Sequence, residues 1–373
     1  MQLNPYLHFM KGSSNARLQL LRRLFKNKGA IFGLAIILLA LFVAIFAYFL
    51  APDGSPDANR MLPAIANKRP GFHMKFLKVK QEAPKEKTSF WTRLSGGVPD
   101  KYQYIPITKA AFKGDSYEAL QYIDEDLTVQ VRFNKSQLAE PAVVNMTFYL
   151  GTDKFGRDIL SRLLIGTRVS LAVGLVAVLL SLTVGIFLGA VAGYFGGKVD
   201  NAVMWLINVL WSIPTLLLVF ALTLALGKGF WQVFIAVGLS LWVSVARLVR
   251  GQVMAMKSLE YIEAAKVLGF SNARIIFKHL LPNILGPVMV IAASNFASAI
   301  IIEAGLSFLG LGVQPPMSSW GLMIKENYNF IITSNPALAL IPGLAIMILV
   351  LAFNLLGNGL RDATDTAAVE AST

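Results

Sequence analysis

The sequence predicts an all-α integral membrane protein with six transmembrane helices and a small mixed α/β insert between the first and second helices. Three observations lead to this fold class. Hydrophobic residues make up 55% of the 373 residues and charged residues only 15%, whereas soluble domains carry about 25% charged residues. The mean hydropathy is +0.59. Six stretches are apolar and long enough to cross a bilayer, which takes about 20 residues.

The longest connection between the predicted spans lies between the first and the second. The spans are residues 30–50, 170–195, 202–226, 230–248, 284–303 and 337–357. The third and sixth contain Pro214 and Pro342, which neighbouring helices accommodate in membrane proteins. Six spans place both termini on the same side. The run 30–50 is longer than a usual signal-peptide core, so we expect an uncleaved anchor.

Basic residues are concentrated on one predicted side of the membrane. That side holds Lys11, Arg17, Arg22, Arg23, Lys26, Lys28, Lys198, Arg247, Arg250, Lys257, Lys266, Arg274, Lys278 and Arg361. The two short connections on the other side carry only Lys228 and Lys325. Basic short loops stay in the cytoplasm, so both termini are predicted to be cytoplasmic. The net charge of +13 then reflects topology and contact with anionic membrane lipid, and we expect no nucleic-acid partner.

The long connection 51–149 is predicted to be an extracytoplasmic insert, because loops of this length cross the membrane largely regardless of their charge. Residues 127–133 alternate between apolar and polar side chains, with the period of a β-strand. Residues 76–80 are a weaker strand candidate. We expect residues 55–145 to form a small, partly irregular domain without a recognisable metal cluster or catalytic set.

The second predicted span contains three glycines spaced by four residues, Gly185, Gly189 and Gly193. This spacing places them on one helix face, where another helix backbone can approach closely. We expect tight helix–helix packing there.

The polar connection 249–283 predicts two short helices at the cytoplasmic surface of the membrane. Ser258 can cap the first helix, and Gly269 ends it in a left-handed turn. Ser271 can cap the second helix, which Pro282 closes. An adaptor for a cytoplasmic partner and an amphipathic pair resting on lipid both fit this pattern.

Residues 263–283, "EAAKVLGFSNARIIFKHLLPN", resemble the EAA signature of permease subunits of ABC importers. The matching residues are Glu263, Ala264, Ala265, Gly269, His279 and Pro282. In that family this segment is the coupling helix that docks into a groove of the ATPase subunit. The resemblance implies that Glu263 and Gly269 carry the coupling, while Ala264 and Ala265 leave a low-relief face for the partner.

Residues 150–174, 303–321 and 351–365 are similar to dipeptide and oligopeptide permeases, and to the second of the two permeases in such systems. Two features depart from that pattern: the insert 55–145 is longer than usual, and Asn358 replaces the usual Asp. The implied organisation is a cytoplasmic tail 1–29, a helix 30–50, an insert 51–149, a permease core 150–365 with coupling helices at 257–281, and a cytoplasmic tail 366–373.

The resemblance implies a peptide importer of the bacterial inner membrane. The implied partners are a second homologous permease, two ABC ATPases and an extracytoplasmic peptide-binding protein. The chain lacks the G-x-x-x-x-G-K-[ST] motif of a phosphate-binding loop. We therefore expect no enzymatic activity and no cofactor in this chain, with ATP and Mg bound by the ATPase subunits. The sequence has no cysteine and no H-E-x-x-H motif, so no metal site is predicted.

Four charged residues are further site candidates. Asp153, Arg157 and Asp158 are expected to form an ion-pair network at an extracytoplasmic gate, although such pairs are commonly structural. Glu303 lies near the end of a span, where an acid can belong to the substrate pathway, anchor the helix end or pair with a nearby Arg. Two other functions stay open: an ABC permease for nickel or another small solute, and a self-sufficient secondary transporter. The latter would need inverted repeats or charges inside the spans, and neither is clear.

Overall fold

The computed structural model describes residues 22–81, 89–113, 116–227, 229–330 and 335–364. Most of the predicted N-terminal tail and all of the predicted tail 366–373 lie outside these ranges. The chain divides into two compact units. The first consists of Met1–Ala40, Ala172–Glu303 and Ile346–Thr373, and the second of Leu41–Leu171 and Ala304–Ala345.

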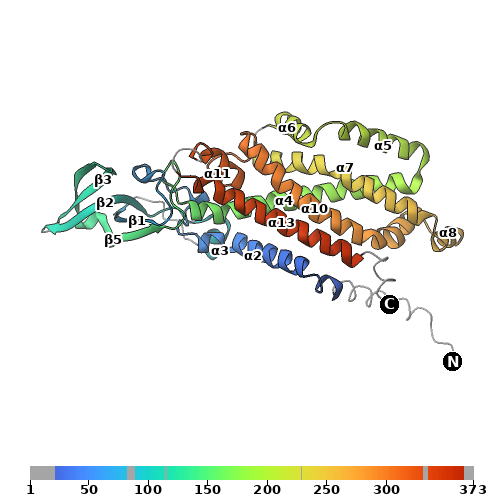
Figure 1. The fold of residues 1–373 in the computed structure, drawn as a ribbon, viewed down its shortest axis with the longest axis horizontal. Helices are drawn as coiled ribbons and strands as arrows, with labels where there is room; N and C mark the ends of the chain where they lie inside the picture. Colours follow the sequence, from blue (N-terminus) through green and yellow to red (C-terminus); the bar gives the residue numbers. More distant parts are fainter. Residues whose placement is uncertain (1–21, 82–88, 114–115, 228, 331–334, 365–373) are drawn as a thin grey trace, which may run out of the picture. The chain divides into compact units, whose positions relative to one another are not determined.

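Most of the described chain is helical (Figure 1). The long helices are α2 (Lys28–Leu50), α4 (Ile159–Phe195), α7 (Phe230–Lys257), α10 (Leu285–Phe308) and α13 (Ala337–Thr364). Shorter helices are α3 (Phe90–Gly96), α5 (Gly197–Trp211), α6 (Thr215–Leu226), α8 (Glu260–Val267), α9 (Asn272–Ile275) and α11 (Trp320–Asn327). Within the described residues, five helical runs are long and apolar enough to cross a membrane, or six if α5 and α6 together form one span.

The predicted span over 202–226 is not one continuous helix. α5 and α6 are bent by 95° at a short break that contains Pro214. Proline has no N–H to donate to the preceding turn, and it disfavours the helical conformation of the residue before it. Pro214 is visible in the sequence, but residues 202–226 stay apolar across the break, so hydropathy alone does not reveal the bend.

Two helices extend well past the predicted spans. α4 begins at Ile159 rather than at residue 170, and α7 continues to Lys257 rather than ending at 248. The polar side chains of these extensions have partners: in α7, the Arg250 guanidinium donates two hydrogen bonds, of 2.5 and 2.6 Å, to the Asp200 carboxylate. Hydropathy marks only the apolar part of such helices.

The predicted close packing at the glycine stripe of α4 is confirmed, and the partner is α7. A Cβ added to Gly185 would lie 2.8 Å from the carbonyl oxygen of Trp242, and one added to Gly193 would lie 2.8 Å from that of Arg250. Any side chain at these positions would push the two helices apart.

Between α2 and α4 the chain forms a five-stranded antiparallel sheet in the order β4-β3-β2-β1-β5. The strands are β1 (Phe72–Lys80), β2 (Tyr102–Lys113), β3 (Ser116–Asp124), β4 (Leu127–Asn134) and β5 (Leu138–Phe148). The predicted strand 127–133 is confirmed as β4, and the weaker candidate near Phe76 as β1. The insert is therefore more regular than expected.

Both faces of the sheet are covered around β1, where the neighbouring side chains of Phe76 and Leu77 are each fully buried. Phe76 packs with Leu62 and Ile65 from the turns before β1, and Leu77 packs with Ile105 and other residues of the strands. Residues at successive strand positions point to opposite faces, so this arrangement gives the sheet two small cores.

Candidate functional site

The segment that resembles the EAA signature forms α8, a turn and a helical run that continues into α10. Gly269 ends α8 with a φ of +77°, as predicted for a left-handed turn. The Ser271 hydroxyl accepts a hydrogen bond of 3.4 Å from the Arg274 N–H, which confirms the predicted cap of α9. The predicted cap at Ser258 is wrong. α8 starts after Leu259, and the Ser258 hydroxyl donates to the carbonyl of Ala255 at 3.1 Å.

Pro282 does not end the second helix, contrary to the prediction. The run from Asn272 to Phe308 stays helical, with a π turn at Ile276–Leu280 and a tight 3-10 turn at Leu281–Ile284. The widened turn lets the Leu281 N–H bond to the carbonyl of Ile276 just before a proline that has no N–H. The Asn283 side chain donates to the carbonyl of His279 at 2.6 Å and satisfies another freed group.

One face of this segment is anchored in a hydrophobic core. The core contains Ala190, Tyr194, Val245, Val249, Val253, Ile262, Ala265, Ile275, Ile276, Leu280, Ile284 and Val288. Ile262, Ile275 and Leu280 are fully buried there. Burying such side chains stabilises the segment by roughly 1.5–3 kcal/mol each. The two short helices are therefore held against α4, α7 and α10 rather than free.

The opposite face of α8 is exposed, and we call Glu263, Ala264, Val267 and Leu268 the α8 patch. Val267 is 88% exposed and Leu268 73%. Ala265 is only 5% exposed, so the prediction that it shares the partner face with Ala264 is wrong. Successive residues of a helix point about 100° apart, and Ala265 turns inward with Ile262.

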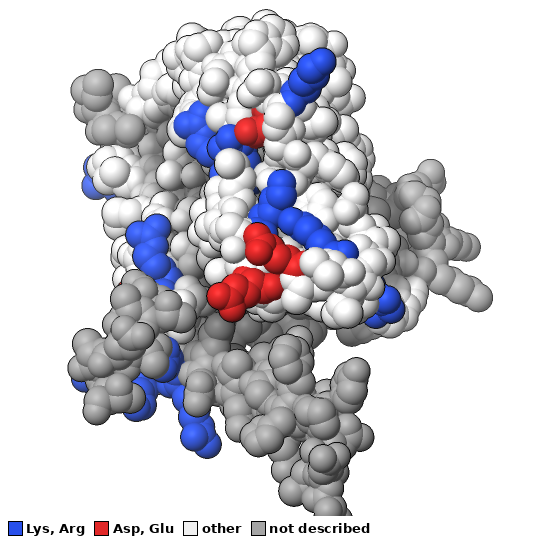
Figure 2. Space-filling model, turned by 90° about the vertical axis from the view of Figure 1, so that its right-hand side faces the viewer, with Lys and Arg blue, Asp and Glu red and all other residues white. Residues whose placement is uncertain are grey.

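Charged side chains surround α8. Figure 2 faces the end of the molecule at which α8 is labelled in Figure 1, and it shows acidic side chains close to basic ones. α8 supplies Glu260 and Glu263 near its start and Lys266 near its end. This order suits the helix dipole, which favours negative charge at the N-terminus and positive charge at the C-terminus.

Tyr194 at the end of α4 connects that helix to α9. Its hydroxyl donates a hydrogen bond of 2.8 Å to the side-chain oxygen of Asn272. The ammonium groups of Lys257 and Lys266 lie 5.7 and 5.9 Å from the centre of its ring. The contact links residues 78 positions apart, and sequence reasoning did not find it.

The second candidate site is a buried ion cluster of Asp153, Arg157, Arg162 and Glu326. Arg157 donates from Nε to Asp153 at 2.6 Å and from Nη2 to Glu326 at 2.7 Å. Arg162 Nη2 donates to the same Glu326 oxygen at 3.2 Å. Both arginines are 1% exposed and Asp153 is fully buried. Two cations and two anions balance one another, so the cluster is formally neutral.

The structure brings together only part of the predicted network of Asp153, Arg157 and Asp158. The Asp158 carboxylate accepts hydrogen bonds from the Ser161 N–H, at 2.8 Å, and from the Ser161 hydroxyl. Burial raises the pKa of Asp158 above its usual range, while the Ser161 bonds oppose this rise. Its role is to cap the start of α4, a position at which a carboxylate is favourable.

Glu303, the remaining charged candidate, is fully buried in α10. A carboxylate that anchors a helix end at the membrane surface would reach water. The burial of Glu303 argues against that role, and a part in the pathway and a pairing with a nearby arginine both stay predictions.

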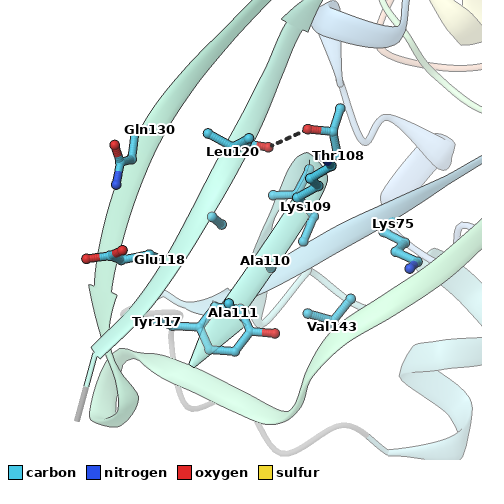
Figure 3. A pocket seen from close by; sticks show the side chains of 12 residues that line it. Lys75, Thr108, Lys109, Ala110, Ala111, Tyr117, Glu118, Leu120, Gln130 and Val143 are labelled. Carbon is cyan, nitrogen blue, oxygen red and sulfur yellow. Dashed lines mark hydrogen bonds between the residues drawn. The ribbon is translucent and has the colours of Figure 1, made fainter. Parts of the chain in front are cut away.

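The sheet carries a groove of about 690 Å³ (Figure 3). Its lining includes the cations Lys75 and Lys109, the acid Glu118 and the ring of Tyr117. The Thr108 hydroxyl donates to the carbonyl of Leu120 at 3.4 Å between neighbouring strands. None of the predicted site residues lies in this groove.

Comparison with known proteins places the chain in a family. The model of binding-protein-dependent transport system inner membrane components matches residues 185–368, and that of the N-terminal domain of oligopeptide transport permease C matches residues 18–70. The glutathione transport system permease protein GsiD of Pectobacterium atrosepticum is 41% identical over 249 residues, which are 67% of this chain and 78% of that protein.

Two further relatives cover different shares of the chain. The oligopeptide transport system permease protein OppC of Bacillus subtilis is 40% identical over 217 residues, 58% of this chain and 71% of OppC. The dipeptide transport system permease protein DppC of Lactococcus lactis is 33% identical over 349 residues, 94% of this chain and 90% of DppC, so the match includes most of the insert. The chain belongs to the binding-protein-dependent inner-membrane components, the permease subunits of ABC importers.

Proposed function

We propose that this chain is the second of two permease subunits in a bacterial peptide importer and forms half of its pathway. The relatives above are permeases for glutathione, oligopeptides and dipeptides, which are all peptides. A homologous permease would complete the pathway, and an extracytoplasmic binding protein would deliver the peptide. The distribution of basic residues supports cytoplasmic termini and an extracytoplasmic insert.

The coupling proposal rests on one observation: α8 and α9 have one buried face and one exposed face. The inner face is anchored through Ile262 and Leu280, and the outer face presents the α8 patch with two largely exposed apolar side chains, Val267 and Leu268. Exposed apolar side chains beside charged ones are typical of a surface that a partner covers. In this importer the partner is the ATPase, whose groove would receive the patch.

Coupling then follows from a mechanical connection. A push on α8 reaches α7 and α10 through the shared core, and it reaches α4 through the bond between Tyr194 and Asn272. ATP binding by the ATPases must favour one state of the permease over the other, because a ligand shifts an equilibrium only by its difference in affinity for the two states. The hydrolysis chemistry, with its Mg, belongs to the ATPase subunits.

A matched pair of variants at Gly269 tests this coupling. Gly269 has a φ of +77°, and a Cβ added there would meet no atom within 4 Å, so the backbone conformation alone decides the cost. Gly269→Asn should keep peptide uptake, because asparagine tolerates this conformation. Gly269→Val should insert normally and lose uptake driven by ATP, because a β-branched residue resists positive φ.

The assay would be uptake of labelled peptide and of nickel by the complete transporter in proteoliposomes, with ATP hydrolysis followed in parallel. Equal uptake by the valine and asparagine variants would sink the coupling assignment. Uptake of nickel in place of peptide would overturn the substrate class and leave the coupling intact.

A further inference from the structure

Helix α3 of the insert is a short helix without a protein core beneath it. None of its seven residues is buried. Phe90 is 57% exposed and Trp91 is 71% exposed. Helices shorter than about 12–15 residues are marginal in water on their own. Contacts outside a core of its own must therefore order this helix, and its two large aromatic side chains are left largely uncovered.

α3 is fixed beside the end of α2. The rings of Phe49 and Phe90 are 5.4 Å apart, and the Arg93 guanidinium lies 4.6 Å from the centre of the Phe49 ring. Arg168 donates a hydrogen bond of 3.0 Å to the carbonyl of Leu94. These contacts hold Phe90 and Trp91 next to the last turn of α2.

The turn that follows α3 makes this placement specific. Gly97 has a φ of +77°, and a Cβ added there would lie 2.7 Å from the ring of Tyr48 and 2.8 Å from the carbonyl oxygen of Gly54. The N–H of Val98 donates to that same Gly54 carbonyl at 2.9 Å. Only glycine allows the chain to pass so close to α2 in this conformation.

The second half of α2 has a continuous apolar surface that faces away from the protein. It consists of Leu41, Phe42, Ile45, Phe49 and Leu50, each 36–52% exposed. α2 is long and apolar enough to be a membrane span, and an exposed apolar surface on a span suits contact with lipid. Phe90 contacts Phe49, and the surface of α3 therefore continues the lipid-facing surface of α2 past its last residue.

We propose that α3 lies in the interfacial region of the bilayer and anchors the insert to the lipid surface. Tryptophan is enriched at this depth because its ring is apolar and its N–H is polar. Arg93 has a long side chain that can keep its charge at the headgroups while its stem stays in apolar surroundings. Arg93 and Lys101 line a hollow of about 490 Å³ beside α3, which adds positive charge where lipid phosphates lie.

The absence of cysteine from the chain makes a direct depth measurement possible. A spin label at Trp91→Cys would be placed in the complete transporter, reconstituted in nanodiscs of phosphatidylethanolamine and phosphatidylglycerol. Phe42→Cys in α2 serves as the control inside the bilayer. Thr128→Cys in the exposed edge strand β4 serves as the control in water.

The expected result is that a water-soluble nickel relaxation reagent reaches the Trp91→Cys label several-fold less than the Thr128→Cys label. Oxygen access should lie between the values for the two controls. A label at Thr92→Cys, also exposed on α3, repeats the test if Trp91→Cys lowers the yield.

Two results would overturn the proposal. Nickel access at Trp91→Cys equal to that at Thr128→Cys would place α3 in water. Shielding that appears only after the binding protein is added, or that vanishes when this chain is reconstituted without the partner permease, would show that protein rather than lipid covers α3.

Discussion

The α8–α9 segment and the buried ion cluster differ in what they expose. The segment exposes apolar side chains, whereas the cluster buries charged ones. In the segment, Val267 and Leu268 are exposed and charged groups surround them, a pattern typical of a surface that binds a partner. In the cluster, Arg157 and Arg162 are buried and their acidic partners come from the same compact unit. The cluster is complete by itself.

This difference separates coupling from stability. A change on the exposed face of α8 should affect assembly and leave the fold intact, whereas a change in the ion cluster should affect the fold first. Asp153 and Arg157 were predicted as gate residues, but their burial and mutual bonding favour a structural role in which they fix the start of α4. Paired substitutions in the two regions test this division.

The largest effect is expected for Arg157→Met. This change leaves the buried Asp153 and the mostly buried Glu326 with one cation fewer, which typically costs about 3–5 kcal/mol of stability. Thermal unfolding of the purified chain in detergent would show a large drop in the unfolding midpoint.

Glu125→Gln is the matched control for a solvated pair. Its carboxylate lies 3.0 Å from the Lys68 ammonium, and the Glu125 side chain is 78% exposed. Such pairs contribute about 0–1 kcal/mol, so the midpoint should hardly move. If both variants lost the same stability, the ion cluster would not stabilise the start of α4 as its burial indicates.

Two leucines of the coupling segment provide the next contrast. Leu280→Ala empties a fully buried position and should cost about 2–5 kcal/mol. Leu268→Ala changes a side chain that is 73% exposed and should alter stability by less than about 0.5 kcal/mol. Thermal unfolding and co-purification with the ATPase would be measured for both. The comparison fails if Leu268→Ala leaves ATPase binding unchanged, because the α8 patch would then not be the docking surface.

Sequence reasoning found the features that depend on local pattern. The left-handed turn at Gly269, the cap at Ser271 and the strand β4 follow from residue types at short spacing. It missed β2, β3 and β5, because their pairing depends on partners elsewhere in the insert. Pro214 was noted, but the 95° bend also depends on how α5 and α6 pack, which local sequence does not specify.

The ion cluster likewise contains one contact that local sequence predicts and others that depend on distant residues. Asp153 and Arg157 are four positions apart and were readily paired. Glu326, which bonds both arginines, lies 164 positions from Arg162 in a polar stretch that resembles any surface helix. Burial and long-range pairing decide which charges meet, and neither can be derived from a single sequence.

A smaller effect is expected from pH. Burial raises the pKa of the Asp158 carboxyl in the folded protein above the unfolded value of about 3.9. An acid with a raised folded pKa contributes stability below its unfolded pKa, and this contribution is lost as the pH rises through the folded pKa.

Asp158→Asn removes this titration. The stability of the native chain relative to that variant should therefore fall as the pH rises from about 4 to the folded pKa, with a slope of at most about 1.4 kcal/mol per pH unit. Unfolding midpoints of both proteins across this range would be compared. Parallel curves would mean that Asp158 carries no such linkage and that its bonds to Ser161 fully offset its burial.

The smallest effect concerns the caps of the coupling segment and sharpens the comparison within it. Ser271→Ala removes the hydroxyl that accepts from the Arg274 N–H, at a cost of about 0.5–1 kcal/mol. The long distance of 3.4 Å favours the lower end of this range. Ser258→Ala should cost less, because that hydroxyl donates back to Ala255 and leaves no helix N–H unbonded. Hydrogen exchange over residues 272–284 should become faster in Ser271→Ala alone. Equal exchange in the two variants would mean that the buried face of the segment, through Ile275 and Leu280, supplies its order without help from the cap.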